Sequence, residues 1–397
     1  MSFEGWKEVE LGDVLEIKKE IYKPQYREDL PYIGLEHIGQ GDLRIHGTGS
    51  AKEVESNKYR FKKGDILFGK LRPYFRKVVM PKIDGVCSTD IWVLKTKSPE
   101  MADQVFLYYL MASEPIIEMA TSSSTGTRMP RADWNHLSKV RIHLPDLPTQ
   151  KKIAKLLAGL DEKIELNNRI NKNLEEMAQA IFKSWFVDFE PFRDGEFVES
   201  ELGMIPKGWD VKSLDEIASF LNGLAMQKYR PTNDEYLPVI KIKELRQGYT
   251  TPDSDKATTQ LHSDYIVNDG DVLFSWSGTL EVKVWCGGKG ALNQHLFKVT
   301  SEMYEKWFYY HWTKFHLDRF RRIAKDKATT MGHIRRKDLS ESKVFVPDQS
   351  TYERINEIMK PIFDQIITLN IQSRKLEKIR NTLLPKLMSG EIRVPLD

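Results

Sequence analysis

Two long stretches of the chain repeat apolar residues at the three- and four-residue spacing that is typical of an amphipathic helix. The first stretch has apolar residues at Ile153, Leu157, Leu160, Ile164 and Leu174. The second has them at Ile362, Ile366, Leu369, Leu376 and Leu383. We therefore predict one helix within residues 149–190 and another within residues 350–390.

Polar residues and prolines interrupt both apolar stripes. Asn167 lies in the first, and a buried Asn between two helices lowers stability but fixes their register. Pro361 is expected to kink the second helix or to delay its start, because proline lacks a backbone donor and clashes with the preceding turn. Pro385 and Gly390 are expected to end it.

The segment before each helix has the pattern of short strands and loops. Residues 65–68, 86–94 and 239–242 are rich in β-branched, aliphatic or aromatic residues and lie close to Gly or Pro. Gly64 and Gly270 are each followed by Asp at predicted turns into strands. A short amphipathic helix is expected near residues 105–119, and another near 304–323.

The same motifs occur twice, in the same order. Residues 61–68 match 267–274, 85–94 match 290–299, and 140–146 match 342–348. Gly5-Trp6 recurs as Gly208-Trp209 ahead of these segments. Matches in one order indicate a tandem duplication. We predict an α+β protein with two similar mixed α/β domains, at residues 1–148 and 207–349, each followed by a long helix, and a linker at 191–206.

Composition narrows the function classes only slightly. The 397 residues carry a formal net charge of +3, so any basic surface for nucleic acid must be local. We expect no transmembrane segment and no signal peptide. The two cysteines are far apart, which argues against a disulfide framework and a cysteine zinc site and favours a cytoplasmic location.

Several motifs together resemble the specificity (S) subunit of type I restriction–modification enzymes. They comprise Trp185-Phe186-Val187-Asp188-Phe189, Ser200-Glu201-Leu202-Gly203, Leu292-Asn293-Gln294-His295 and Leu384-Pro385-Lys386-Leu387. The resemblance covers essentially the whole chain. It implies two target-recognition domains, each reading one half of a bipartite DNA target. It also implies that the two helices pack as an antiparallel coiled coil with pseudo-two-fold symmetry and set the spacer.

The resemblance also implies partners and cofactors. The helices would dock two methyltransferase (modification) subunits, and restriction subunits would join the full complex. This chain would bind no cofactor or metal of its own, because S-adenosylmethionine, ATP and Mg²⁺ would belong to the partner subunits. A helix from Thr149 to Phe186 would be ~57 Å long, more than one ~34 Å turn of B-DNA.

Basic and aromatic residues in predicted loops are the candidates for DNA contact, because phosphate contacts position a protein and base contacts specify sequence. In the first copy they are Lys70, Arg72, Arg76, Thr125, Arg128 and Arg131. In the second copy they are Trp276, Lys283, His333, Arg335 and Arg336. Different side chains at equivalent places are what two readers of different half-sites need.

Two enzyme readings remain to be weighed against a non-catalytic chain. Gly64 to Lys70 resembles the start of a phosphate-binding loop, but Leu71 replaces the hydroxyl residue that would hold Mg²⁺. Asp253, Glu281 and Lys283 could form the acid–acid–lysine set of a metal-dependent DNA nuclease. A third reading is a helical scaffold whose domains bind protein only.

Overall fold

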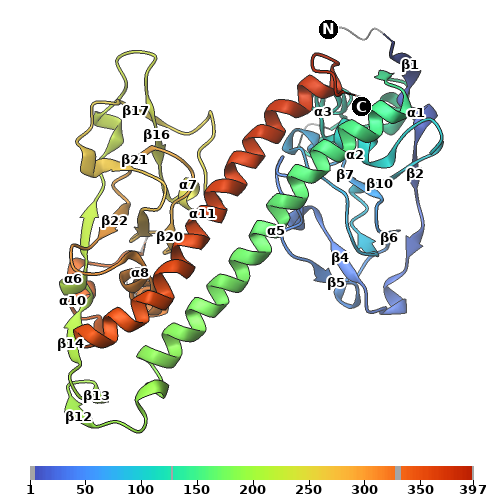
Figure 1. Ribbon diagram of the computed structural model, residues 1–397. Helices are drawn as coiled ribbons and strands as arrows, with labels where there is room; N and C mark the ends of the chain where they lie inside the picture. Colours follow the sequence, from blue (N-terminus) through green and yellow to red (C-terminus); the bar gives the residue numbers. More distant parts are fainter. Residues whose placement is uncertain (1–4, 127, 327–331, 396–397) are drawn as a thin grey trace. The chain divides into compact units, whose positions relative to one another are not determined.

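The computed structural model describes residues 5–126, 128–326 and 332–395, and the chain divides into two compact units. Unit 1 comprises Met1–Lys163 and Leu376–Asp397, and unit 2 comprises Ile164–Lys375. Each long helix contributes one part to each unit (Figure 1).

Unit 1 contains a four-stranded antiparallel sheet that positions the segments discussed below. Its strand order is β2-β10-β7-β8, with bounds Leu15–Lys18, Ile91–Thr96, Ile66–Gly69 and Val78–Val79. The strands are rich in Ile, Leu, Val and Phe, and β7 is buried along its whole length. Gly64 has a φ of 85° at the turn before β7, a backbone conformation that favours glycine.

The second sheet of unit 1 has five strands. Its order is β3-β6-β9-β4-β5, with bounds Ile21–Tyr22, Lys58–Phe61, Gly85–Cys87, Pro31–Ile33 and Gly49–Ser50. Strands β4 and β9 are parallel. A separate antiparallel pair joins β1 (Lys7–Glu10), which precedes α1 (Leu11–Val14), to β11 (Arg141–Leu144).

Unit 2 repeats this arrangement. Its four-stranded sheet has the order β15-β22-β19-β20, with bounds Ser219–Asn222, Leu296–Thr300, Val272–Ser275 and Val282–Val284. A second sheet has the order β17-β16-β21-β18, with bounds Lys256–Ala257, Leu237–Ile240, Gly290–Leu292 and Ile266–Val267, and its β16 and β21 are parallel. The pair β14 (Asp210–Ser213) and β23 (Lys343–Val346) corresponds to β1 and β11, with α6 (Leu214–Ile217) after β14. The duplication predicted from sequence is therefore present in the topology.

Each predicted amphipathic helix is two helices. Residues 105–119 fall in α2 (Gln104–Ala112) and α3 (Glu114–Ser122), and 304–323 in α8 (Lys306–Phe315) and α9 (Leu317–Asp326). The α2 helix packs on β8 and β10, and α8 packs on β20 and β22. Shorter helices are α4 (Trp134–Leu137), α7 (Ile242–Gln247) and α10 (Arg336–Ser340). Ile242, expected at a strand end, begins α7 instead.

The two long helices are α5 (Leu147–Phe186) and α11 (Gln349–Met388), with 40 residues each. They begin in the same way, because the Asp146 carboxylate accepts the N–H of Thr149 at 3.0 Å and the Asp348 carboxylate accepts that of Thr351 at 3.0 Å. The expectation that Pro361 delays the second helix was wrong, since α11 is already helical from Gln349.

Pro385 does not end α11 either. The helix continues to Met388 and is followed by Gly390 with a φ of 70°, the left-handed conformation common after a helix. A proline inside a helix disturbs only the preceding turn, because it lacks a backbone N–H and crowds the carbonyl four residues earlier. The helix continues through Pro385 despite this disturbance.

The two long helices pack antiparallel within each unit. In unit 1 Asp161 of α5 meets Arg380 of α11, and in unit 2 Asn167 meets Gln372 at 2.9 Å. The predicted seam residues Ile153, Leu157, Ile164, Asn167, Ile366 and Leu369 are buried. The others are half-buried: Leu160, Leu174, Ile362, Leu376 and Leu383.

The predicted linker is partly ordered into a hairpin. Its strands are β12 (Phe197–Ser200) and β13 (Gly203–Pro206), which pair in an antiparallel manner. Both cysteines are free and buried. Among the described residues, every helix is too short or too polar to span a lipid bilayer.

Candidate nucleic-acid interface

In unit 1, backbone hydrogen bonds tie the end of β7 to two loops. The N–H of Lys70 donates to the carbonyl of Asp90 at 3.0 Å, and the N–H of Ala132 donates to the carbonyl of Lys70 at 2.9 Å. The N–H of Arg72 donates to the carbonyl of Pro130 at 2.7 Å. We call this strand end and its two bonded loops the recognition edge of unit 1.

Unit 2 has the same backbone frame at the end of β19. The N–H of Trp276 donates to the carbonyl of His295 at 3.4 Å, and the N–H of Ile334 donates to the carbonyl of Trp276 at 3.0 Å. The N–H of Gly278 donates to the carbonyl of Gly332 at 2.9 Å. This is the recognition edge of unit 2, and its positions 276, 295 and 333 correspond to 70, 90 and 131.

The side chains on the two frames differ in chemistry. In unit 1, the guanidinium of Arg131 donates two hydrogen bonds to the carboxylate of Asp90, with Nε–Oδ1 at 2.8 Å and Nη2–Oδ2 at 3.3 Å. This hydrogen-bonded pairing raises the pKa of Arg131. Lys70 is half-buried beside them, and burial lowers the pKa of its ammonium.

Two exposed arginines extend from the unit 1 edge. Arg72 has a φ of 51°, and its guanidinium donates to the carbonyl of Arg128 at 3.2 Å. Arg128 is itself exposed. Thr125 and Arg131 exchange backbone hydrogen bonds at 3.1 and 3.0 Å, which closes the loop that carries Arg128. Position 127 of this loop lies outside the described residues.

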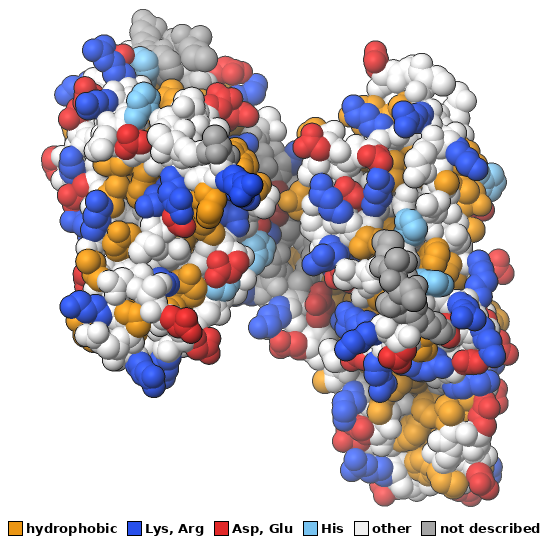
Figure 2. Space-filling view, turned by 180° about the vertical axis from the view of Figure 1, so that it is seen from behind, with side chains coloured by type: hydrophobic (Ala, Val, Ile, Leu, Met, Phe, Trp, Pro, Cys, Tyr) orange, Lys and Arg blue, Asp and Glu red, His pale blue; other side chains and the backbone are white. Residues whose placement is uncertain are grey.

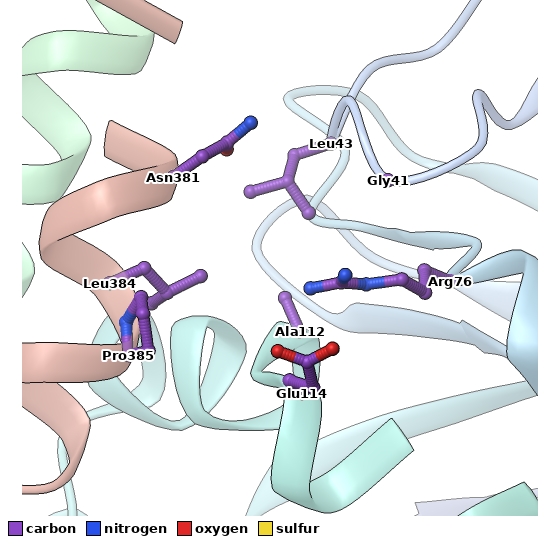
Figure 3. A pocket seen from close by; sticks show the side chains of 8 residues that line it. All are labelled: Gly41, Leu43, Arg76, Ala112, Glu114, Asn381, Leu384 and Pro385. Atoms are coloured by element: carbon purple, nitrogen blue, oxygen red, sulfur yellow. The ribbon is translucent and has the colours of Figure 1, made fainter. Parts of the chain in front are cut away.

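Arg76 does not lie on the recognition edge. Its side chain points into a pocket beside Glu114, with Leu384 of α11 on the opposite wall (Figure 3). Its Nε is buried and has no hydrogen-bond partner among the described residues. The sequence placed Arg76 next to Arg72, but the turn at Pro73–Phe75 separates them.

In unit 2 the edge is aromatic and imidazole-rich. The indole N–H of Trp276 donates to Asn222 Oδ1 at 2.9 Å and to the Gln294 carbonyl at 3.2 Å. The ring of His333 lies edge-on to Trp276, with centroids 6.2 Å apart. Ser277 Oγ is 3.0 Å from His295 Nδ1.

The other candidates in unit 2 have mixed placements. Arg335 and Arg336 follow the edge and are exposed, and Arg336 also donates to the Phe220 carbonyl at 3.2 Å. Lys283 is on β20 and is held by Glu281 at 3.1 Å and by the Arg246 carbonyl at 2.6 Å. Residues 327–331, which precede His333 in the chain, lie outside the described residues.

The predicted DNA contacts did not include Asp90 or His295, which the fold brings to the two recognition edges. A usable signal was present, because Asn293-Gln294-His295 was singled out as a motif and residues 85–94 were matched to 290–299. The motif repeats a local turn: the N–H of Asp90 donates to Ser88 Oγ and that of His295 to Asn293 Oδ1, both at 3.2 Å.

The enzyme readings gain no support from the geometry. Gly69 is the last residue of β7 and Gly64 lies two residues before the strand, so the segment between them does not form a loop around a phosphate. Glu281 is paired with Lys283, and the described residues contain no group of three His, Cys, Asp or Glu side chains that could hold a metal ion.

Charge is distributed locally rather than over one broad basic face. In the space-filling view, Lys and Arg side chains alternate with acidic ones over most of the visible surface (Figure 2). On the visible face of unit 2, basic, histidine and apolar side chains lie close together (Figure 2). This agrees with the small net charge of +3.

Comparisons with known proteins agree with one another. The family described as Type I restriction modification DNA specificity domain matches residues 3–176 and 206–380. The chain is 32% identical to the MjaIX specificity subunit of Methanocaldococcus jannaschii over 73% of this chain and 69% of that protein. It is 23% identical to the HindI specificity subunit of Haemophilus influenzae over 98% and 99% of the two chains.

A solved structure has the same fold. The type I restriction–modification S subunit from M. genitalium aligns over 96% of both chains with a TM-score of 0.59 and 16% identity. The two matched segments fall on the two copies described above, each with its recognition domain and most of its long helix. The chain therefore belongs to the family of type I restriction modification DNA specificity domain proteins.

Proposed function

We propose that this chain is the sequence-specific DNA-binding subunit of a type I restriction–modification complex. The recognition edge of each unit reads one half of a bipartite DNA target. The observation that carries the proposal is the pair of identical backbone frames with different side chains: Lys70, Asp90 and Arg131 in unit 1, and Trp276, His295 and His333 in unit 2.

This pattern fits base reading better than it fits a structural role. Readers of two different half-sites must present different side chains on the same backbone frame, as these two edges do. Guanidinium groups such as those of Arg72 and Arg128 can donate two hydrogen bonds to guanine O6 and N7. Exposed basic side chains can also neutralise phosphates and fix the register on the duplex.

The long helices support the rest of the complex in this proposal. They hold the two recognition domains at a set spacing and dock two methyltransferase subunits, which restriction subunits then join. Those partners bind S-adenosylmethionine, ATP and Mg²⁺, and this chain supplies no catalytic group. A duplicated chain can offer equivalent surfaces to two copies of one partner.

The first test is a salt-titrated binding assay with the purified full chain and duplex DNA. Affinity should fall steeply with salt, because each neutralised phosphate contributes about −0.9 to the slope of log K against log salt. A shallow slope at all sequences would favour a domain pair that binds protein only. Cleavage of DNA by the chain and Mg²⁺ alone, lost in Glu281→Ala, would favour the nuclease.

The second test identifies the target. The chain is expressed with its methyltransferase partner in a host that lacks both, and methylated sites are mapped across the genome. A single bipartite motif is expected. Lys70→Ala with Arg72→Ala should relax one half of it, and Lys207→Ala, directly after β13 and outside both recognition edges, should leave the motif unchanged.

A further inference from the structure

The two long helices have the same length, so each residue of α5 has a counterpart in α11. At one such pair of positions the two units differ in a way that bears on how the helices pair. Counted from the first residue of each helix, Asp161 of α5 corresponds to Phe363 of α11, and Ala178 of α5 corresponds to Arg380 of α11. In an antiparallel pair these residues occupy the same place in the two units.

Unit 1 fills this place with an ion pair between the buried Arg380 and the partly buried Asp161. Nη1 of Arg380 donates to Asp161 Oδ1 at 2.6 Å and to the Asp42 carbonyl at 3.2 Å, and the Tyr109 hydroxyl donates to Asp161 Oδ2 at 2.7 Å. Arg380 is only 1% exposed. Burial disfavours its charge, but the Asp161 carboxylate more than compensates, and the pKa of Arg380 is raised.

Unit 2 fills the same place with apolar groups. Ala178 and Phe363 are 1% and 3% exposed and belong to one buried hydrophobic cluster. Tyr310 packs on Phe363 with ring centroids 5.2 Å apart. This unit shows that an apolar pair is sufficient to join the two helices at this place, so stability alone does not require the ion pair of unit 1.

We propose that the Asp161–Arg380 pair gives the helices their pairing specificity: it favours pairs of α5 with α11 over α5–α5 and α11–α11 pairs between two copies of this chain. Duplication creates this hazard, because two homologous helices present similar seams. In an α5–α5 pair, Asp161 would face Ala178 of the second copy. In an α11–α11 pair, Arg380 would face Phe363. The first arrangement leaves the partly buried Asp161 without its cation, and the second buries Arg380 without its anion, which is strongly unfavourable.

A second polar contact also favours pairing of α5 with α11 over pairing of two α11 helices. Asn167 of α5 donates to Gln372 and Ser373 of α11, at 2.9 and 3.3 Å, and all of its exposed surface is lost. Its equivalent in α11 is Leu369, which is also buried. An α11–α11 pair would therefore place Leu369 against the polar groups of Gln372 and Ser373. A single buried polar residue is known to select register and partner in paired helices.

The test separates specificity from stability. Replacing a buried ion pair with apolar residues of similar size often leaves stability unchanged or higher. The full chain carrying Asp161→Leu with Arg380→Met should therefore unfold at or above the wild-type temperature. It should also lose selectivity when it is unfolded and refolded together with a mass-tagged copy of itself.

Native mass spectrometry then counts mixed dimers. We expect at least ten times more mixed dimer for Asp161→Leu/Arg380→Met than for wild type. The matched control, Glu162→Leu with Lys378→Met, changes neighbouring exposed positions and should remain monomeric, which excludes simple surface stickiness. A double variant that refolds only as monomer, that unfolds at a lower temperature or that fails to fold would overturn the proposal.

Discussion

The recognition edges of units 1 and 2 share the same pattern of backbone hydrogen bonds but carry side chains of different chemical type. Unit 1 places an ion pair, Asp90–Arg131, and the ammonium of Lys70 on the frame, whereas unit 2 places Trp276 and two histidines there. The same contrast holds where α2 and α8 meet the long helices, with Tyr109 bonded to Asp161 in unit 1 and His311 among aromatic rings in unit 2. A duplicated fold can therefore keep its geometry while its two halves respond differently to acid, substitution and DNA sequence.

The largest expected difference is in acid. Burial lowers the pKa of His311 to about 3 and that of His316 to about 4, from 6.5. His311 stacks on Phe182 with ring centroids 5.3 Å apart, and the nearby Lys314 also opposes its protonation. Because both folded-state values are depressed, the unfolded state binds more protons below pH 6.5. Unit 2 should lose up to about 4 kcal/mol of stability by pH 5.

This acid effect can be measured by hydrogen exchange. Amides of α8 and α9 should exchange faster at pH 5 than at pH 7.5 after correction for intrinsic rates, while those of α2 and α3, which contain no histidine, should change less. His311→Phe should remove about half of the effect. The exposed His262 serves as the control, since His262→Ala should leave it unchanged. Equal acid sensitivity in both units would contradict the comparison.

The next effect concerns packing at the edge of unit 2. Trp276→Ala should lower the free energy of unfolding by about 3 kcal/mol, because it removes an aromatic side chain that packs on Phe297 and bonds to Asn222. Trp276→Phe should recover most of the loss. Lys70→Ala at the equivalent place should cost less than about 1 kcal/mol. Urea unfolding curves give the three values, and similar losses at both positions would contradict the prediction.

A smaller effect is expected on DNA binding by the exposed arginines of unit 1. Arg72→Ala or Arg128→Ala should cost about 1–3 kcal/mol of discrimination at one base pair if the guanidinium reads a base. The change should appear in one half-site only, as measured by affinities for duplexes in which each half is varied separately. A uniform loss for all sequences, with a salt slope smaller by about 1, would assign the residue to a phosphate instead.

The smallest effect is expected from the ion pair of unit 1. Asp90→Asn should change stability by less than about 1 kcal/mol, because the pair is partly exposed, with the side chain of Arg131 43% exposed. It should nevertheless alter preference in one half-site, because it releases the guanidinium of Arg131. Methylation mapping of the variant tests this, and an unchanged motif would show that Arg131 only holds its loop.

The sequence predicted those features that arise from periodicity and repetition. The spacing of Ile153 and Leu157, and of Ile366 and Leu369, identified seams that are buried in the structure. The repeated Gly-Asp turns marked the entry to β7 and β19. Local spacing is set by the 3.6-residue helix and the glycine backbone, so it is readable without coordinates.

What the sequence did not predict depends on contacts between distant segments. Arg131 and Lys283 were predicted to contact DNA because of their charge. In the fold each forms an ion pair, Arg131 with Asp90 and Lys283 with Glu281. Arg76 was grouped with Arg72 by proximity along the chain, yet a single turn directs it toward α11. Pro385 was expected to end its helix, but α11 runs on to Met388.

The backbone frame at the end of β7 and β19 has a consequence for how these proteins change over time. Its hydrogen bonds run from main chain to main chain, so they form whether the strand end carries lysine or tryptophan. New side chains can therefore arise there while the main-chain scaffold stays intact. Under the proposed function, a few substitutions at the strand end would change the DNA motif that is read and keep the main-chain bonds that hold the edge together.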